Sequence, residues 1–464
     1  MRKLPADLPF PPQERERGEL KSITSKKYAF ITMTPMFGGG EETKKVDKLR
    51  PVRAPSVRGA LREWWRVLNR YDKKGARLSD EELYRRECLI WGGVAFKKSR
   101  DTSEQQALLS AVRVDVGEWH DLRTIQIAEW KISPKSGKGR WQIKSQYPPY
   151  AVWPFQGESE NGQQKAAPDE ALDEGFQFVV TIGYDLEQIE KNLVFGGVSA
   201  NEVEHQVKAA LTAWANFGGV GSRSRRGLGA LWCEDLAFDD EAALKHFVDV
   251  VPEIRACLLG APCNDAGGAW KDALNPLREF RQGEGIGRNE GPGRSFWPEP
   301  SEIRTATNNH HRWHSKRIPA TEGVDGFPRA NFGMPIIFRF VGDPQEPPPT
   351  MLLPLVDVHD TEPANRMASP LILRPIRFKK GEIRSLALFF PVPRYEGLWL
   401  KGADKNVEKA GHDRKVANDD SPLQGFYPDQ ALEAFESYLC ERRGTGESGR
   451  FHRVKTFSVE GGGA

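Results

Sequence analysis

The sequence lacks the cysteine and histidine spacing that builds disulfides or structural zinc. Five cysteines, at positions 88, 233, 257, 263 and 440, form no C-x-x-C pair. This odd, unpaired set predicts free thiols in a reducing compartment, so we expect a cytoplasmic protein. His310, His311 and His314 form a local cluster. Cys257 and Cys263 lie upstream, but the spacing matches neither half of a zinc finger, and we predict no metal and no cofactor.

Long apolar runs and nucleotide-binding motifs are also missing. No segment approaches the roughly 18 apolar residues of a membrane-spanning helix. Residues 1–19 are charged and rich in proline, unlike a signal peptide or an anchor, so residues 1–20 are expected to form a disordered arm of a soluble protein. Counting G-x-G-x-x-G from Gly219 and Gly221 places Ser224 at the third glycine, and no G-x-x-x-x-G-K-[ST] occurs, which argues against a nucleotide-binding P-loop.

What the sequence does contain is a concentrated positive charge. The total is only +3 over 464 residues, so the distribution has to indicate the partner. Residues 44–77 hold twelve Lys or Arg against three Asp or Glu, a local charge of +9. The length suggests two or three domains with ample material for a core.

The most unusual stretch, residues 217–229, holds five glycines and three arginines without one acid. Glycine permits positive φ and close backbone approach, and successive N–H groups in such a loop form an anion-binding concavity. Arginine forks suit phosphate oxygens. The alternative is a flexible surface loop with solvated arginines. We favour a long anionic polymer as partner, contacted by Gly218, Gly219, Gly221, Ser222, Arg223, Ser224, Arg225 and Arg226.

Residues 56–71 predict an amphipathic helix, because Val57, Leu61, Trp64, Leu68 and Tyr71 recur at helical spacing. Arginines recur every four residues on the other side. Trp64 is assigned to the core, whereas Trp65 either stacks on a base or packs at the edge of the core. The alternative is an ordinary helix with solvated arginines. We favour a face that follows phosphates, and the predicted contact residues are Arg53, Arg58, Arg62, Trp65 and Arg66.

A third basic segment, residues 131–144, carries five Lys or Arg and no acid, with tryptophans at 130 and 141. Basic residues interleaved with aromatics suit single-stranded RNA, and a solvated hairpin tip explains the pattern equally well. The predicted RNA-contact residues here are Lys131, Lys138, Arg140 and Trp141.

The order of predicted elements indicates an α+β protein whose first half is a ferredoxin-like (RRM-related) domain with insertions. The first domain is placed at 21–240, with strands at 28–36, 112–116, 122–127, 176–184 and 228–232, helices at 56–71, 83–89 and 203–214, and an insertion or linker at 156–175. The second is placed at 241–464, with helices at 242–250, 269–280 and 429–442 and strands at 335–341, 370–378 and 384–391.

Several motifs resemble a known family. Residues 34–40 read Thr-Pro-Met-Phe-Gly-Gly-Gly, residues 55–66 read Pro-Ser-Val-Arg-Gly-Ala-Leu-Arg-Glu-Trp-Trp-Arg, and residues 90–93 read Ile-Trp-Gly-Gly. With the glycine-rich loop and the segments 295–300, 332–335 and 366–371, they are similar to the RAMP superfamily of CRISPR ribonucleoproteins. The likeness is to the first, or head, subunits of the type III-B (Cmr) antiviral effector complex.

This resemblance implies two ferredoxin-like domains and a non-catalytic, RNA-binding subunit near the 3′ end of the guide RNA that helps to engage target RNA. The implied partners are guide RNA, target RNA or both, together with other RAMP subunits of the complex, and no membrane. The residues do not tell which RNA is held.

An enzyme is the main alternative, because some RAMP relatives are metal-independent endoribonucleases that process guide RNA. Such cleavage needs a general base, and His205, on the helix before the glycine-rich loop, is the one histidine that we place within possible reach. We favour an exposed helix residue without a catalytic role, and no catalytic aspartate can be assigned. A purely structural assembly cap is a third alternative, which leaves the arginine pattern unexplained. We further predict that Arg58, Arg62 and Arg66 line one RNA groove with Arg223, Arg225 and Arg226.

Overall fold

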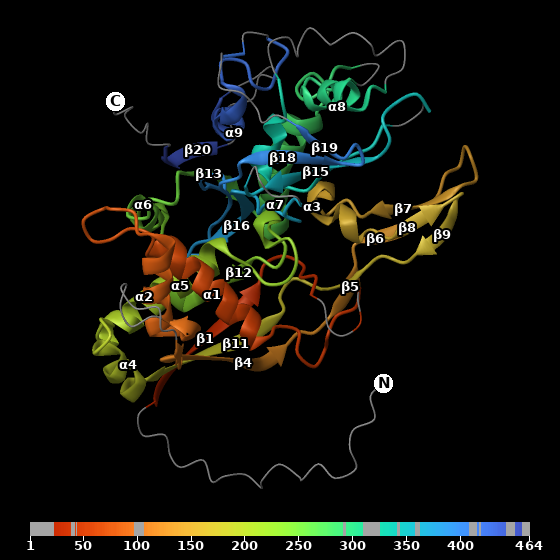
Figure 1. The fold of residues 1–464 in the computed structure, drawn as a ribbon. Helices are drawn as coiled ribbons and strands as arrows, with labels where there is room; N and C mark the ends of the chain where they lie inside the picture. Colours follow the sequence, from red (N-terminus) through yellow and green to blue (C-terminus); the bar gives the residue numbers. More distant parts are fainter. Residues whose placement is uncertain are drawn as a thin grey trace, which may run out of the picture.

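The computed structural model describes residues 23–38, 42, 44–96, 106–290, 294–309, 325–340, 344–357, 362–407, 415–416, 419–441 and 451–456. The arm predicted at residues 1–20 and the cluster of His310, His311 and His314 lie outside these ranges. Figure 1 shows the elements stacked in successive layers.

The first half of the chain builds a four-stranded antiparallel sheet in the order β12-β1-β11-β4. Two long helices, α1 (Ala54–Leu68) and α5 (Ala200–Phe217), connect its strands and pack on one face. This strand order and connection are those of a ferredoxin-like unit, which confirms the predicted fold class. The strands are β1 (Ile23–Thr32), β4 (Val112–His120), β11 (Gln177–Asp185) and β12 (Leu231–Trp232).

The second half repeats this topology. Its sheet order, β16-β17-β13-β20, is the same ferredoxin-like order read from the other edge, and α7 (Ala266–Gln282) and α9 (Ala431–Cys440) cover one face. The strands are β13 (Ala256–Cys263), β16 (Leu371–Arg377), β17 (Ile383–Phe389) and β20 (Phe451–Lys455). The predicted boundary at residue 240 falls just before α6 (Glu241–Asp249), and it stays a prediction.

Insertions decorate both units. Residues 156–175, predicted as an insertion or linker, contain a hairpin and a further strand. The first unit also carries α2 (Asp80–Trp91), α3 (Pro149–Val152), α4 (Leu186–Leu193) and the pairs β2 (Gly93–Phe96) with β3 (Gln106–Leu108), β5 (Thr124–Gln126) with β10 (Glu170–Leu172), β6 (Ala128–Ile132) with β7 (Gly139–Ile143), and β8 (Glu158–Glu160) with β9 (Gln163–Ala166). The second unit carries α8 (Glu299–Thr307) and a sheet of β14 (Ile336–Phe338), β15 (Thr350–Leu355), β18 (Gly397–Lys401) and β19 (Lys405–Val407).

The two units share one hydrophobic core. The helices α1 and α5 lie between the first sheet and the second (Figure 1). On the side of the first sheet, the ring of Trp214 packs 5.0 Å from that of Phe30. On the other side, the ring of Trp64 lies 6.1 Å from that of Phe390, in the second unit. The predicted apolar stripe of α1 is confirmed at Leu61, which is fully buried. The layer of helices therefore joins the two halves.

Candidate nucleic-acid interface

The glycine-rich loop connects α5 to β12 and contains the short 3-10 helix η2 (Ser224–Arg226). Its glycines are needed for contacts within the protein. A Cβ on Gly221, whose φ is 78°, would lie 2.3 Å from the carbonyl oxygen of Phe37. A Cβ on Gly227, whose φ is 76°, would lie 2.7 Å from the ring of Trp270 and 2.9 Å from the carbonyl oxygen of Leu373. The close approach predicted for this loop is thus made to the chain's own backbone.

The backbone N–H groups of the loop are also engaged by the protein. The N–H of Ser222 donates to the carbonyl of Phe37 at 2.7 Å, and that of Gly229 donates to Pro35 at 2.9 Å. The N–H of Val220 donates to the carbonyl of Gly229 at 3.0 Å. The predicted anion-binding concavity is therefore wrong for these three groups. Gly221 and Ser222 are exposed, and contacts from them to RNA stay a prediction.

Two of the loop arginines hold the second unit against the first. Arg226 is buried and donates to the carbonyl of Leu371 at 2.8 Å and to the hydroxyl of Ser369 at 2.9 Å. Arg225 donates to the carbonyl of Ser369 at 2.7 Å and to Glu63 of α1 at 2.8 Å. Burial is the main cause that lowers the pKa of Arg226 to about 10. These two side chains form a clasp between the units, and RNA contacts from them stay a prediction.

An arginine that sequence reasoning missed completes this clasp. Arg374 of β16 is fully buried and donates to the carbonyls of Gly218 and Leu231, the second at 2.6 Å. Burial lowers the pKa of its guanidinium to about 9. Nothing in the local pattern of β16, where Arg374 stands among apolar residues, distinguishes a buried arginine from an exposed one. The start and the end of the glycine-rich loop are thus both fixed to the second sheet.

The arginines of α1 are turned towards α2. Arg62 and Arg66 share the carboxylate of Glu87, with 2.6 Å between Arg66 Nε and Glu87 Oε2. Arg58 donates to the carbonyl of Trp91. Glu63 of α1 contacts the loop at Arg225, and a single groove lined by the arginines of α1 and of the loop stays a prediction.

The two adjacent tryptophans of α1 are both in the core. Trp64 is buried, as predicted. Trp65 is 2% exposed, and its Nε1–H donates to Gln206 of α5 at 2.9 Å. Of the two alternatives for Trp65, the structure therefore forms the packed one. Arg53, at the N-terminal end of α1, is exposed and lies 3.9 Å from Asp47.

The pairing at Glu87 predicts an effect on stability. We expect Glu87→Gln to lower the free energy of unfolding at pH 7 by about 1.5–3 kcal/mol, the range for hydrogen bonds to charged groups. Burial alone would raise the pKa of Glu87, but hydrogen bonds from Arg66 and Arg62 outweigh it and hold this pKa below its usual range. A carboxylate with a lowered pKa contributes stability above about pH 4.5 that is lost as pH falls through the folded-state value.

Urea unfolding of the wild type and of Glu87→Gln between pH 7 and pH 3 tests this. The difference between the two proteins should shrink as the pH falls. Glu63→Gln, at an exposed position of α1, is the matched control and should cost less than about 1 kcal/mol. A difference that stays constant with pH would contradict a charged role for Glu87.

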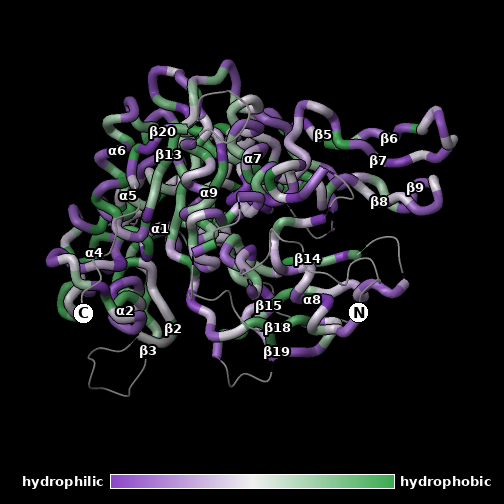
Figure 2. The backbone as a smooth tube through the Cα atoms, turned by 90° about the horizontal axis from the view of Figure 1, so that it is seen from above, coloured by the Kyte–Doolittle hydropathy of each residue, from purple (hydrophilic) through white to green (hydrophobic). Residues whose placement is uncertain are grey.

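The hairpin β6–β7 differs from α1 and the glycine-rich loop in that its cations are exposed. Lys131 lies opposite Arg140 in the register, and Trp130 lies opposite Trp141 with ring centroids 5.2 Å apart in an edge-on contact. The hairpin projects from the body as a hydrophilic arm beside β8 and β9 (Figure 2). The hairpin that was one of the two alternatives for this segment is present, and the two tryptophans stabilise it across the strands. RNA contacts from Lys131, Lys138, Arg140 and Trp141 stay a prediction.

Most of the cations on this hairpin have no acidic partner. Lys131 pairs with Glu129 at 2.8 Å. Lys135, Lys138 and Arg140 are exposed, and among the described residues no carboxylate oxygen lies within 4.0 Å of their nitrogens. Of the three predicted basic sites, this hairpin is therefore the one with exposed cations that lack a carboxylate partner among the described residues.

Three further features concern the alternatives of catalysis, metal binding and membrane insertion. His205 is exposed on α5. Within the ranges that the structure describes, no group of three or more His, Cys, Asp or Glu side chains is placed to hold a metal ion. In the same ranges, no helix combines the length and the apolar character needed to cross a bilayer.

Part of the chain matches a known protein family. The sequence model of the RAMP superfamily matches residues 29–232, which are the first ferredoxin-like unit. The match to the RAMP superfamily thus covers the first unit of the chain. No curated protein matches it in sequence.

The chain also has a distant similarity to three solved structures. The crystal structure of Cmr1 from Pyrococcus furiosus in its apo form is 13% identical, covering 94% of this chain and 100% of that chain, with a TM-score of 0.45. A chain of the cryo-EM structure of the type III-B Cmr-beta complex bound to cognate target RNA is 12% identical, covering 89% and 100%, with a TM-score of 0.39. Cmr6 from Pyrococcus furiosus is 12% identical, covering 46% and 99%, with a TM-score of 0.20.

Proposed function

We propose that the chain is a non-catalytic RNA-binding subunit of a CRISPR type III-B (Cmr) effector complex, at the head near the 3′ end of the guide RNA, where it assists capture of target RNA. The match of residues 29–232 to the RAMP superfamily and the motifs around residues 34–66 support this assignment. The observation that carries RNA binding is the hairpin β6–β7, whose cations Lys135, Lys138 and Arg140 have no carboxylate partner among the described residues.

The mechanism is electrostatic capture of a sugar–phosphate backbone. An arginine or lysine already paired with a carboxylate gains less from a phosphate, because the existing pair has to be given up. The arginines of α1 are in that position through Glu87, whereas the hairpin cations are hydrated and exchange only water and counterions. Trp141 follows Arg140 on β7 and is partly exposed, but its ring lies on the opposite face of the hairpin with Trp130, so an RNA contact from it stays a prediction.

Changing the hairpin cations tests the proposal. The triple variant Lys135→Ala, Lys138→Ala and Arg140→Ala should weaken RNA binding and make the slope of log affinity against log salt shallower by about 2, at roughly 0.7 per phosphate contact with a single strand. Fluorescence anisotropy with labelled guide and target RNA over a range of salt concentrations measures both quantities.

The control variant changes net charge equally at cations that are already paired. Lys191→Ala, Lys245→Ala and Arg384→Ala remove partners of Glu187, Asp249 and Glu241 and should leave the salt slope unchanged. Equal losses in both triple variants would mean that only total charge matters, and the hairpin would lose its role.

The non-catalytic part of the proposal is tested with the same labelled RNAs. The purified chain, with and without divalent metal, should give no specific cleavage products. Site-specific cutting that disappears in His205→Ala would overturn this part and favour a guide-RNA-processing endoribonuclease.

A further inference from the structure

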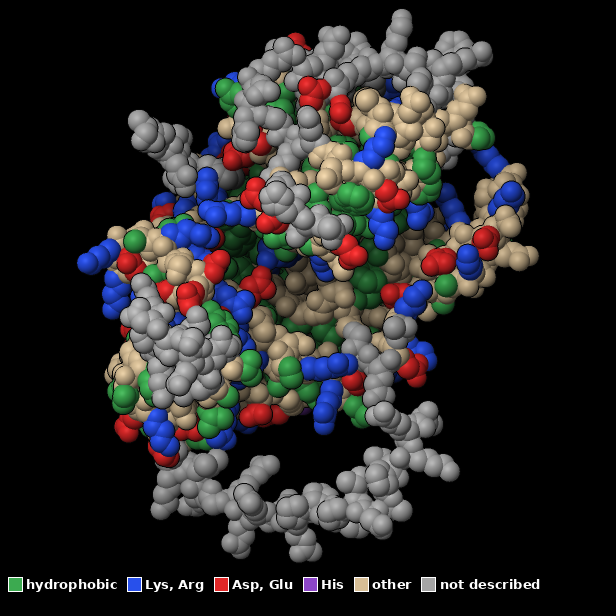
Figure 3. Space-filling model, in the orientation of Figure 1, with side chains coloured by type: hydrophobic (Ala, Val, Ile, Leu, Met, Phe, Trp, Pro, Cys, Tyr) green, Lys and Arg blue, Asp and Glu red, His purple; other side chains and the backbone are tan. Residues whose placement is uncertain are grey.

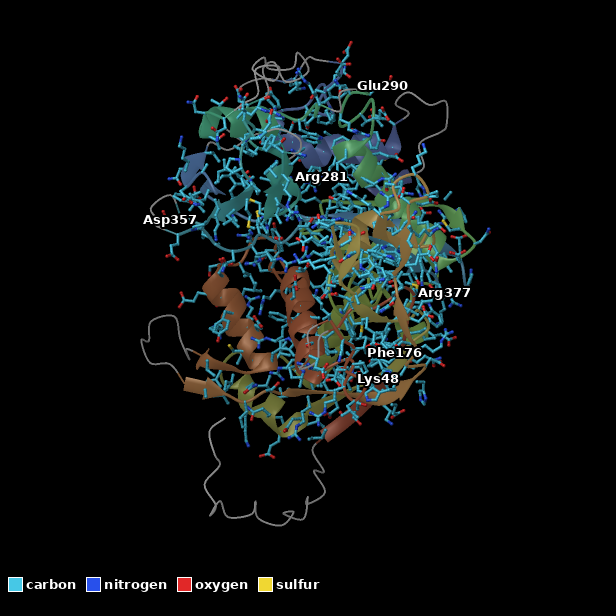
Figure 4. All side chains as sticks on the ribbon, turned by 90° about the vertical axis from the view of Figure 1, so that its right-hand side faces the viewer. Lys48, Phe176, Arg281, Glu290, Asp357 and Arg377 are labelled. Atoms are coloured by element: carbon cyan, nitrogen blue, oxygen red, sulfur yellow. The ribbon has the colours of Figure 1, made fainter. Side chains whose placement is uncertain are left out.

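A second concentration of positive charge lies inside the molecule, where the two units meet. Its centre is Tyr150 of α3, whose hydroxyl accepts a hydrogen bond from Arg281 of α7 at 2.6 Å. Arg223 of the glycine-rich loop donates to the carbonyl oxygen of the same tyrosine at 3.2 Å. Arg281 is labelled in Figure 4, where it lies among interior side chains. Three segments far apart in the sequence thus bring two arginines to one tyrosine.

The charges at this junction are not balanced. Arg226 and Arg329 are buried nearby, and Arg329 pairs with Glu299 at 3.1 Å. Among the described residues, this is the one carboxylate bonded to any of these arginines. The Nε–H groups of Arg223 and Arg281 are inaccessible to solvent and have no hydrogen-bond acceptor there. Because like charges repel strongly away from water, such a cluster is stabilised by a bound anion.

The titration of the neighbouring groups agrees with an excess of positive charge. Burial alone would raise the pKa of Tyr150, but the charges of Arg281, Arg226 and Arg223 outweigh burial and lower this pKa below its usual value of 10. Burial, and to a smaller extent the charge of Arg366, lowers the pKa of Arg223. Arg366 is exposed, so the cluster extends from the interior to the surface.

We propose that this junction is a binding site for a single phosphate group, held by Arg223 and Arg281 beside the hydroxyl of Tyr150 and approached past Arg366. Guanidinium forks match the oxygens of a phosphate, and several of them around one anion exceed what a carboxylate can satisfy. The face drawn in Figure 3 is hollowed at its centre, between the first unit and the strands β15 and β18, and side chains of both charges border the hollow.

This site goes beyond the proposed function, which places RNA binding at the hairpin β6–β7. Phosphate binding at the junction can be measured without RNA. The same chemistry has two sources, a phosphodiester within an RNA strand or a terminal or free phosphate. The junction and the hairpin β6–β7 use separate residues. A failure at one of them is therefore distinguishable from a failure at the other.

Inorganic phosphate is the probe. In thermal unfolding at constant ionic strength, phosphate should raise the Tm of the wild type more than chloride does. Arg281→Ala should weaken phosphate binding at least tenfold in isothermal titration. It should not lower the Tm without phosphate as far as a core truncation does, because it also removes a repelling charge. Arg278→Ala, an exposed arginine on the same helix, is the matched control and should leave the phosphate response unchanged.

Arg223→Ala, at the loop, provides a second and independent test, with the same loss of phosphate binding expected. Equal phosphate affinity in wild type, Arg281→Ala and Arg223→Ala would overturn the proposal. Short RNAs with and without a 3′ or 5′ phosphate then distinguish the two sources. A tenfold preference for an RNA with a terminal phosphate, lost in Arg281→Ala, identifies a phosphomonoester site. Equal binding that Arg281→Ala weakens identifies a backbone site.

Discussion

Gly227→Ala is expected to lower the free energy of unfolding by about 2–5 kcal/mol. An L-residue at its φ of 76° costs about 1–2 kcal/mol. The added methyl group would also press on the ring of Trp270 and the carbonyl of Leu373, and overpacking of this kind costs about 1–3 kcal/mol. Guanidinium unfolding followed by circular dichroism measures the loss.

The chain provides a control for the backbone part of this effect. Gly137, at the turn of the hairpin β6–β7, has a φ of 66°, and a Cβ there would meet nothing within 4 Å. Gly137→Ala should therefore cost only about 1–2 kcal/mol. If both substitutions cost the same, the glycine at 227 would be needed for its conformation alone and not for contact with the second unit.

Trp270→Ala is expected to lower the free energy of unfolding by about 3–5 kcal/mol, the usual range for removal of a buried aromatic side chain. Trp270 is 1% exposed, and its Nε1–H donates to the carbonyl of Arg226 at 2.7 Å. Trp270→Phe keeps a ring but leaves that carbonyl without its donor, so it should cost about 1–3 kcal/mol. The same unfolding measurement applies.

A double-mutant cycle joins the two predictions. In a Trp270→Ala background the methyl group added at Gly227 has no ring to press on, so its cost should fall by about 1–2 kcal/mol, within the range for contacting residues. Strictly additive losses would mean that the ring of Trp270 and the loop do not stabilise each other, and the clasp would then rest on Arg225, Arg226 and Arg374 alone.

Much of the first unit could be predicted because its signals are local. The helix α1 has an apolar stripe of 3.6-residue period, and β1 and β11 contain β-branched and aromatic residues between clear turns. In the second sheet the edge strand β20 was missed, and so was the interior strand β13. It is buried along most of its length, so it shows no alternation, and Gly260 and Pro262 interrupt it. The strand order of the second unit could not be completed without it.

The candidate site was harder to predict because its partners are distant in the sequence. The composition of residues 217–229 indicated that glycine is required, but it could not tell that the close neighbour is Phe37 rather than RNA. Four arginines with one acid in residues 56–71 indicated excess charge, yet Glu87, on another helix, compensates two of them.

The junction around Tyr150 was missed entirely. Its arginines come from four separate segments and form no local pattern. The segment 366–371 was noted only for its family resemblance.

The shared layer of α1 and α5 also has a mechanical consequence. Two domains joined by a polar interface usually swing about a hinge. Here a rotation of one unit against the other would expose the apolar faces of Trp64 and Phe390. It would also break the buried hydrogen bonds of Arg374, so we expect the two units to move as one rigid body. A partner that binds the second sheet would thus fix the orientation of the hairpin β6–β7 without contacting the hairpin itself.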